Sequence, residues 1–395
     1  MTATAVSGSA TRQARPWLIL VGCFLLSAGL NAFVIAPSSI VPLFIERFDI
    51  TKAAAGNIIS AAVVGAIITQ IPGGYLLDRY DNRVLLGGAV GVYIAVVLLI
   101  QVVDGYTPFL GLRVVGGMTA GFVFTAGANV VGEVFPLAQQ DLATGIYITS
   151  APASFALAHA TGPLLSTRYG PLTVFLFHAA VTVVGLVVFW LAVADPVRTG
   201  ETPTLAEFTR ALGNRALILV ALSSFAMYSL YLFLNMWIPT YGSEVLSLSL
   251  SQAGFVTAIV PLAGIVARPT GGWLSGYLGG RRRLVVGGGL FGALVFMTAL
   301  QFAANLVAFL LLLAAAAFTL QLGVGLYYVI TRELSAAGTE GTSLTVLTAI
   351  GFTGSFVAPI AGGRIIAAYS WPAAFVTFAA VGGLGVLVLI PVGGR

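Results

Sequence analysis

The chain has 395 residues; 18 are Lys or Arg and 13 are Asp or Glu, which gives a formal net charge of +5. Only 8% of the residues are charged and 58% are hydrophobic, whereas a soluble globular protein has about 25% charged residues. This composition excludes a water-soluble enzyme, a disordered chain and a collagen-like chain.

The long apolar runs predict an all-α, polytopic membrane protein, because a membrane helix needs about 20 apolar residues. The runs do not alternate apolar and polar residues, which disfavours a β-barrel. The first run follows Arg12 and Arg15 and is too long for a signal peptide, so we expect it to be retained as a span. Charged and turn residues divide the sequence into twelve expected spans, at 17–43, 53–77, 84–103, 107–132, 142–166, 171–193, 216–241, 250–275, 284–302, 305–331, 341–367 and 371–391.

The basic residues predict the orientation of these spans. With the N-terminus inside, twelve Arg residues fall on the inner side, and the outer loops hold only Arg47, Lys52 and Arg168. This bias predicts a multi-pass protein of the cell membrane with both termini in the cytoplasm. The Arg residues lie in short loops between spans, which indicates topology and no nucleic-acid partner. The expected surroundings are a lipid bilayer, and a monomer is expected.

Residues 194–215 form the longest interruption between spans. They contain Pro196, Pro203 and a capping-box pattern from Thr204 to Glu207. This pattern fits either an interfacial helix on the cytoplasmic side or a solvated linker. We therefore expect an N-terminal six-helix bundle (1–193), a cytoplasmic linker (194–215) and a C-terminal six-helix bundle (216–395).

The two expected bundles repeat each other in sequence. The pairs Tyr75/Trp273 and Glu133/Glu333 match at offsets of 198 and 200 residues, and three further matches share nearly the same offset. Two pseudo-symmetric bundles are typical of transporters that expose a mid-membrane site alternately to the two sides of the membrane.

The segment Gly74-Tyr75-Leu76-Leu77-Asp78-Arg79-Tyr80-Asp81-Asn82-Arg83 resembles the motif between spans 2 and 3 of the major facilitator superfamily. The segment from Leu112 to Gly117 resembles the span-4 Arg motif of the same family. The resemblance covers nearly the whole chain and implies a twelve-helix transporter. It also implies a set of charged gating residues, of which Arg113 lies nearer the outer end of its span: Asp78, Arg79, Arg83, Arg113, Glu133, Arg281 and Glu333.

Several of these gate residues have alternative interpretations. Arg113 could serve the fold, with Asp104 as its partner, because a charge inside a span needs a compensating group. Glu133 and Glu333 end equivalent spans and could either carry protons or form a charge clasp, with Arg83 and with Arg281 or Arg283.

The segment from Ala267 to Ser275 also resembles span 8 of the nitrate/nitrite porter branch of that family. In that branch one Arg in span 8 and one in span 2 hold the anion. Arg268 matches the span-8 position, Gln70 stands at the span-2 position, and the span-5 signature of the branch is absent. The resemblance implies a related small anion, held by Arg268 with Gln70 as the weaker counterpart.

Arg268 is also expected to lie deep within its membrane span. It lies about eight residues from the inner end of its span, roughly 12 Å deep, where an Arg costs about 2.5–3.5 kcal/mol. The expected span interiors hold Arg113, Arg268 and Arg364 but neither Asp nor Glu. An unpaired guanidinium that faces a wet cavity favours an anionic ligand. The alternative is a structural or snorkelling Arg268.

Polar residues at helical spacing suggest the walls of a cavity, although hydrogen bonds between helices would explain them equally well. His159 could contact the substrate, carry a proton or be a satisfied buried side chain. In the resembled family, spans 1, 4, 7 and 10 line the cavity. The remaining candidates for the binding site are Asn31, Asn129, Tyr228, Asn235, Gln321 and Tyr328.

Together these patterns predict a secondary active transporter that moves a small anion, either an inorganic oxyanion or a short carboxylate, by alternating access. The alternatives are a proton-coupled exporter of drug-like or amphiphilic compounds, and a carrier for a neutral solute. The sequence has no nucleotide-binding loop and no metal-ligand cluster, so we expect no enzyme activity, no cofactor and no metal. A coupling ion, uniport and exchange all remain open.

Overall fold

The structure is a computed structural model that describes residues 15–193, 212–335 and 339–392, and within these ranges it contains helices and no strands. The N-terminal helices are α1 (Pro16–Ile35), the 3₁₀ helix η1 (Ala36–Ile40), α2 (Val41–Phe48), α3 (Lys52–Ile68), α4 (Gln70–Arg79), α5 (Asn82–Val102), α6 (Tyr106–Val134), α7 (Leu137–Ile148), α8 (Ser150–Tyr169) and α9 (Thr173–Ala192). The C-terminal helices are α11 (Arg215–Glu244), α12 (Leu250–Tyr277), α13 (Arg282–Leu300), α14 (Leu306–Gln321), α15 (Val324–Leu334), α16 (Glu340–Ala368) and α17 (Trp371–Leu387).

The helices make up twelve membrane spans, as predicted. In the described ranges, nine helical stretches are long and apolar enough to cross a membrane, and α3 and α17 are shorter apolar helices. Helix α4 prolongs α3, and α7 and α8 form one further span that is interrupted at Thr149. The all-α, polytopic fold class is therefore confirmed.

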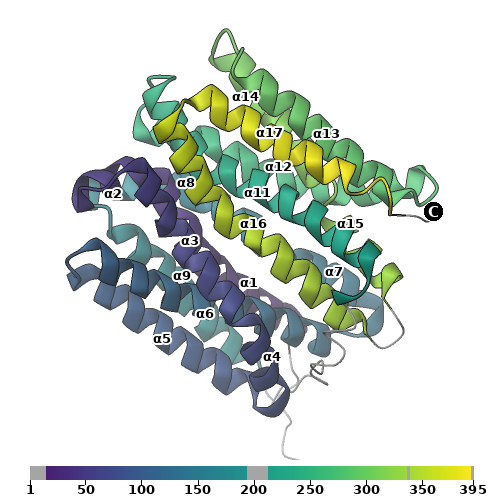
Figure 1. Ribbon diagram of the computed structural model, residues 1–395. Coiled ribbons are helices and arrows are strands. Elements are labelled where there is room, and N and C mark those ends of the chain that lie inside the picture. Colours follow the sequence, from purple (N-terminus) through teal and green to yellow (C-terminus); the bar gives the residue numbers. More distant parts are fainter. Residues whose placement is uncertain (1–14, 194–211, 336–338, 393–395) are drawn as a thin grey trace, which may run out of the picture.

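The helices form two groups, from α1 to α9 and from α11 to α17 (Figure 1). Helix α1 packs against α9, α6 and α8, and α11 packs against α16, α12 and α17. The groups meet where α3 lies beside α16 and α8 lies beside α12. The domain boundaries stay a prediction, since residues 194–211 of the expected linker lie outside the described residues.

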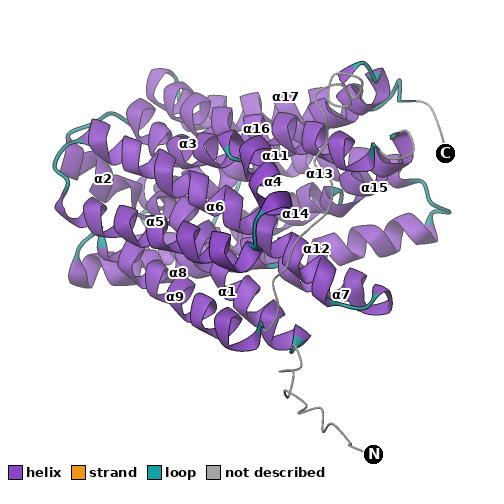
Figure 2. Cartoon of the chain, turned by 90° about the horizontal axis from the view of Figure 1, so that it is seen from below, coloured by secondary structure: helices purple, strands orange, loops and turns teal. Residues whose placement is uncertain are grey.

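The bundle has two ends, and the N-terminal and C-terminal helices mark one of them. We call the end where α1 begins and α17 ends the terminal face, and the opposite end, where α2 ends and α3 begins, the far face. Figure 2 shows the same bundle turned by 90°, with the helices stacked across its whole width. The N-terminal half contributes α3 and α8, and the C-terminal half contributes α16 and α12, to the contact between halves.

Four spans are broken within the membrane, which the sequence analysis did not predict. Helix α1 changes to the 3₁₀ helix η1 just before Pro37, which has no amide hydrogen to donate to the carbonyl of Phe33. The span of α3 and α4 is interrupted at Thr69, that of α7 and α8 at Thr149, and that of α14 and α15 at Leu322 and Gly323.

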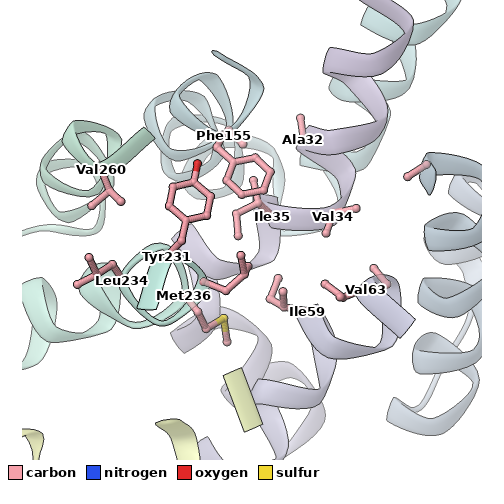
Figure 3. Close-up of a cluster of buried hydrophobic side chains, with 14 of the residues drawn as sticks. Ala32, Val34, Ile35, Ile59, Val63, Phe155, Tyr231, Leu234, Met236 and Val260 are labelled. Atoms are coloured by element: carbon pink, nitrogen blue, oxygen red, sulfur yellow. The ribbon is translucent and has the colours of Figure 1, made fainter. Parts of the chain in front are cut away.

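The two halves are closed against each other toward the far face. Figure 3 shows a cluster of buried apolar side chains whose labelled members come from α1, α3 and α8 of one half and from α11 and α12 of the other. Helices α4, α7 and α15, which lie toward the terminal face, make their main contacts within their own half. The side chains labelled in Figure 3 are Ala32, Val34, Ile35, Ile59, Val63, Phe155, Tyr231, Leu234, Met236 and Val260.

Candidate functional site

Arg268 lies on α12 and is held by Gln321, the last residue of α14. The Nη2 of Arg268 donates to the Oε1 of Gln321 at 3.3 Å, and the Nε2 of Gln321 donates to the carbonyl of Val260 at 2.8 Å. Val260, Gly264 and Arg268 are spaced four residues apart and therefore share one face of α12. Gly264 makes room for the amide, since a Cβ there would collide with the Gln321 side chain. Gln321 thus lies across α12 and orients the guanidinium.

The guanidinium of Arg268 has more donors than the structure uses. An Arg side chain carries five N–H donors. Its Nε is buried without a hydrogen-bond partner, and its bond to Gln321 is long. Gln321 is neutral, and no carboxylate among the described residues lies within ion-pair distance of Arg268. The positive charge of the guanidinium is therefore not compensated by an acidic side chain in that part of the chain.

The break between α14 and α15 lies next to this group. Gly271 packs directly on the carbonyl of Leu322, where the helix is interrupted, and any side chain at Gly271 would clash with that backbone. Discontinuous helices near the middle of the membrane are typical of substrate sites in transporters. Arg268 and Gln321 therefore lie beside a helix break of the type found at substrate sites in transporters.

Two tyrosines extend the group toward α11 and α15. The hydroxyl of Tyr228 lies 3.4 Å from the hydroxyl of Tyr328, and its ring packs edge-on against Phe352 at 5.2 Å. The guanidinium of Arg268 is close enough to Tyr228 and Tyr231 to interact electrostatically with both. We call Arg268, Gln321, Tyr228 and Tyr328 the arginine cluster. Its members come from four helices of the C-terminal half.

His159 and Asn235 form a hydrogen bond between the two halves. The Nε2 of His159 on α8 lies 3.2 Å from the Oδ1 of Asn235 on α11. Asn235 donates its Nδ2 to the carbonyl of Tyr231, which turns its Oδ1 toward His159. His159 must therefore donate from Nε2, and its Nδ1 is a buried acceptor without a partner.

An aromatic contact joins the same two helices as this hydrogen bond. Phe155 lies one helical turn before His159, and Tyr231 lies one turn before Asn235. The rings of Phe155 and Tyr231 stack at 5.9 Å with an interplanar angle of 13° (Figure 3). The two pairs together tie α8 to α11.

The other predicted binding residues, Asn31, Asn129 and Gln70, lie on helices of the N-terminal half. Asn31 donates to the carbonyl and the hydroxyl of Ser27 on α1, and the hydroxyl of Ser27 in turn bonds Ser150 at 2.7 Å. Asn129 lies partly buried on α6. Gln70 begins α4 directly after the break at Thr69, and its side chain lies outside the described residues.

Arg113 is fully buried and binds backbone carbonyls. Its Nη1 and Nη2 donate to the carbonyls of Phe33 and Val34, and its Nε donates to Ile58 at 3.0 Å. The ring of Phe33 also lies 4.5 Å from the guanidinium carbon. The carbonyls of Phe33 and Val34 belong to the end of α1, where Pro37 leaves Phe33 without its usual partner, and that of Ile58 belongs to α3. Arg113 thus joins α1, α3 and α6, and Asp104 is not among these partners.

The other predicted gate residues lie near the terminal face. Arg83 pairs with Asp81, the residue that caps α5, at 2.8 Å. Arg79 ends α4, and Asp78 lies in the same helix with a side chain outside the described residues. Glu133 is exposed near the end of α6.

In the C-terminal half, Glu333 pairs with Arg282 at 2.5 Å, whereas Arg281 or Arg283 was the expected partner. Arg283 donates instead to the carbonyl of Val392. Arg281 is exposed directly before α13. Of three consecutive arginines, the middle one therefore points to α15, because successive residues of a helix face different directions.

The sequence analysis missed an ion pair that joins the halves at the far face. Lys52, the first residue of α3, lies 2.7 Å from Glu244, the last residue of α11. Trp371 donates its Nε1 to the same carboxylate at 3.3 Å, and its ring lies 6.0 Å from the ammonium group. The sequence signal that could have indicated this pair was the opposite charge of Lys52 and Glu244, which lie at the outer ends of two expected spans. We call these three residues the far-face clasp.

Comparison with known proteins identifies the family. The sequence profile described as "Major Facilitator Superfamily" matches residues 18–300 and, again, residues 246–394. The chain belongs to this superfamily. Its members carry small-molecule solutes across membranes, and the chain is accordingly a multi-pass membrane transporter.

The superfamily relatives differ in what they carry. The chain is 27% identical over 264 residues to a D-galactonate transporter of Escherichia coli O6:H1, covering 59% of this chain and 60% of the relative. It is 26% identical to the multidrug resistance protein MdtG of Salmonella choleraesuis, covering 68% of both chains. It is also 26% identical to a probable chloroplastic anion transporter of Oryza sativa, covering 72% of this chain and 53% of the relative.

A solved structure supports the fold. A bacterial homologue of the human lysosomal transporter Spinster, in an inward-facing and unoccupied conformation, superimposes with a TM-score of 0.76. The match covers 98% of this chain and 96% of that chain at 15% sequence identity. At this identity the likeness concerns the fold alone.

Proposed function

We propose that this superfamily member is a secondary active transporter of a small anion, an inorganic oxyanion or a short carboxylate, and that Arg268 binds the anion. One observation carries the proposal: Arg268 holds a positive charge inside the membrane, its partner Gln321 is neutral, and its buried Nε lacks an acceptor. A planar guanidinium with free donors matches a carboxylate or an oxyanion in both charge and geometry.

The neighbours of Arg268 suit the same ligand. The hydroxyls of Tyr228 and Tyr328 can donate hydrogen bonds to an anion without competing for the positive charge. Because Gln321 orients Arg268, the guanidinium is preorganised before the ligand arrives, which lowers the entropic cost of binding. In this proposal the N-terminal half supplies Asn31, Asn129 and Gln70, and Asn235 and His159 close the site toward the far face.

The contacts between the halves suggest the transport cycle. Closure at the far face, with α4, α7 and α15 packed within their own halves, fits a state that is open toward the terminal face. We assign the terminal face to the cytoplasm, because it carries most of the Arg residues. To open the far face, the chain must break the far-face clasp and the bond between His159 and Asn235. The pair of Arg282 and Glu333 and the gate residues near the terminal face then act on the cytoplasmic side.

A second candidate is a proton-coupled exporter of drug-like compounds. It is favoured by the aromatic ring of Phe352, which packs on Tyr228 of the arginine cluster, and one relative is named a multidrug resistance protein. A carrier that prefers cations would need a buried carboxylate near the site. The galactonate transporter and the probable anion transporter among the relatives support the anion instead.

The test is a thermal-stability panel on the purified protein with inorganic oxyanions, short carboxylates, cationic drugs and neutral sugars. A ligand at 100 times its dissociation constant stabilises the folded state by about 2.7 kcal/mol. We expect one anion class to stabilise the wild type and to lose this effect in Arg268→Gln. The matched control is Arg364→Gln, because Arg364 lies within α16 but is exposed on its surface.

Uptake into proteoliposomes then follows with the anion that the panel selects. The proposal predicts flux in the wild type and in Arg364→Gln, and none in Arg268→Gln. Stabilisation by cationic drugs alone, or an equal anion effect in wild type and Arg268→Gln, would overturn the anion proposal in favour of the second candidate or of a neutral solute.

A further inference from the structure

The imidazole of His159 has one hydrogen-bond partner and one unused ring nitrogen. His159 lies on α8 with a fully buried side chain, and its Nε2 donates to the Oδ1 of Asn235 on α11 at 3.2 Å. The Nδ2 of Asn235 donates to the carbonyl of Tyr231 at 2.8 Å, so the Oδ1 of Asn235 is the atom that faces His159. The Nδ1 of His159 is buried without a partner, and an N–H there would have no acceptor. In this conformation His159 is therefore a neutral imidazole that carries its proton on Nε2.

The backbone and the neighbours of His159 also belong to the contact between the two halves. Pro163 lies four residues further along α8 and has no amide hydrogen to donate to the carbonyl of His159. Gly254 on α12 packs against this carbonyl, and a Cβ at Gly254 would collide with it. One helical turn before His159, the ring of Phe155 stacks on Tyr231 (Figure 3). His159 thus contacts both α11 and α12, and its Nδ1 becomes accessible from the far side only when the halves separate.

Among the described residues, no negative charge lies beside His159. Helix α8 packs on α1, η1, α7, α9 and α12, and it bonds to α11 through Asn235. Two acidic residues occur on these helices. Glu244 pairs with Lys52 at the far face, and Asp141 on α7 lies 18 residues before His159, about 27 Å along the same span. The other titratable side chains between the ends of these helices are Cys23, Tyr147, His178, Tyr228, Tyr231, Tyr241 and Arg268. A second proton on His159 would therefore lack both an acceptor and a counter-charge.

We propose that His159 is a proton-binding site of the transport cycle, which is empty while the far face is closed and holds one proton while it is open. When the halves separate, the bond to Asn235 breaks, and the lone pair of Nδ1 takes a proton from water on the far side. Nε2 keeps its own proton, so the imidazole becomes an imidazolium. The added proton must return to water before the empty carrier closes again, because the contact offers it no acceptor. The proposal rests on the cycle of opening and closure proposed above, but not on the identity of the solute.

The second histidine of the chain, His178, provides a matched control. Histidine is the side chain that ordinarily titrates between about pH 5 and 8, and the chain has two. His178 is as buried as His159, and both of its ring nitrogens lack a partner. It lies on α9, whose main contacts are with α1, α5 and α8 of its own half. Since His178 is not placed between the halves, its charge should not affect their separation.

The test measures the opening of the far face against pH, in the full chain and without any solute. Spin labels at Tyr169→Cys and Tyr369→Cys, in a Cys23→Ser background, report on the two halves. A histidine in water is half protonated at about pH 6.5. Proton binding to the open state alone should therefore raise the ratio of open to closed protein about fourfold from pH 8 to pH 6, and about 30-fold from pH 8 to pH 5.

The histidine variants assign this response. We expect it in the wild type and in His178→Gln. His159→Gln should not show it, because the Gln amide can still donate to Asn235 but binds no proton. Glu244 of the far-face clasp stays largely ionised down to about pH 5, so Glu244→Gln should show the same fold-change as the wild type.

A variant that opens the far face without touching His159 shows the proton directly. A Cβ at Gly56 on α3 would lie 2.7 Å from the carbonyl carbon of Pro359, so Gly56→Ala should separate the halves. Its control is Gly91→Ala, since Gly91 on α5 has open space around it. With nitrogen-15 in the histidine rings, magnetic resonance should show His159 of Gly56→Ala as a neutral imidazole at pH 8 and as an imidazolium at pH 5.

Three results contradict the proposal: wild-type distances that do not respond to acid, a response of His159→Gln equal to that of the wild type, and a ring of His159 that stays neutral at pH 5 in Gly56→Ala. The same variant separates this failure from a failure of the transport cycle. If Gly56→Ala lengthens the distances and acid does not, only the proton site is wrong. If neither lengthens them, the proposed opening of the far face is wrong as well.

Discussion

Gly56 and Gly254 make the same contact in the two halves of the molecule. Gly56 on α3 lies against the backbone of Pro359 on α16, and Gly254 on α12 lies against His159 and Pro163 on α8. Each glycine thus lies on the second span of one half and meets a proline-bearing helix of the other half. The contacts between the two halves therefore follow the same twofold repeat as the sequence.

These two glycines should control how firmly the far face closes. A Cβ at Gly254 would lie 2.9 Å from the ring of Pro163, and one at Gly56 would lie 2.7 Å from the carbonyl carbon of Pro359. Such overpacking costs about 1–3 kcal/mol, which is roughly 5- to 150-fold in an equilibrium between two conformations. Gly254→Ala and Gly56→Ala should therefore shift the protein toward a state that is open at the far face.

Distances between spin labels can measure this shift. Labels at Tyr169→Cys and Tyr369→Cys would report on the two halves, since both side chains are exposed at the far-face ends of α8 and α16. The buried Cys23 is replaced by Ser in this background. We expect longer distances in both glycine variants and unchanged distances in Gly91→Ala. Unchanged distances in all three would contradict the prediction.

The far-face clasp should contribute modestly to the same closure. Lys52 and Glu244 are partly exposed, with side-chain exposures of 32% and 36%, and such ion pairs are worth about 0.2–1 kcal/mol. Glu244→Gln should shift the label distances in the same direction as Gly254→Ala but by no more than about fivefold in population, and high salt should mimic it. The exchange Lys52→Glu with Glu244→Lys should restore closure. If the exchanged variant behaves like Glu244→Gln, the pairing does not act as a clasp.

Arg113 should be required for stability because of Pro37. Arg113→Met would leave buried carbonyls at the end of α1 without donors, at a cost of about 3 kcal/mol or more. Pro37→Ala restores an amide that can bond the carbonyl of Phe33, so the double variant should lose less stability than the sum of the single ones. Thermal unfolding of the four proteins forms a double-mutant cycle. Strict additivity would show that Pro37 does not create the need for Arg113.

The sequence alone predicted the all-α fold and the span count, because hydropathy is visible in one dimension. It named Arg268, Gln321, Tyr228 and Tyr328 as separate candidates but not as a cluster, since their contact depends on how α12 crosses the break after α14. The pair of Lys52 and Glu244 was missed because its residues are 192 positions apart in the sequence and meet only in the folded bundle. The acceptors of Arg113 were missed because backbone carbonyls leave no signal in the sequence except Pro37.

The last prediction places a competing charge inside the proposed anion site. In Gln321→Glu a carboxylate would replace the amide oxygen that Arg268 already contacts, so the guanidinium would gain a permanent internal anion. The protein should fold at least as stably as Gln321→Met, because a buried ion pair replaces an unpaired charge. It should nevertheless lose its response to the anion that stabilises the wild type. Gln321→Met keeps the positive charge and should retain a weaker response. An unchanged anion response in Gln321→Glu would mean that the ligand does not meet Arg268, and the anion site would have to lie elsewhere.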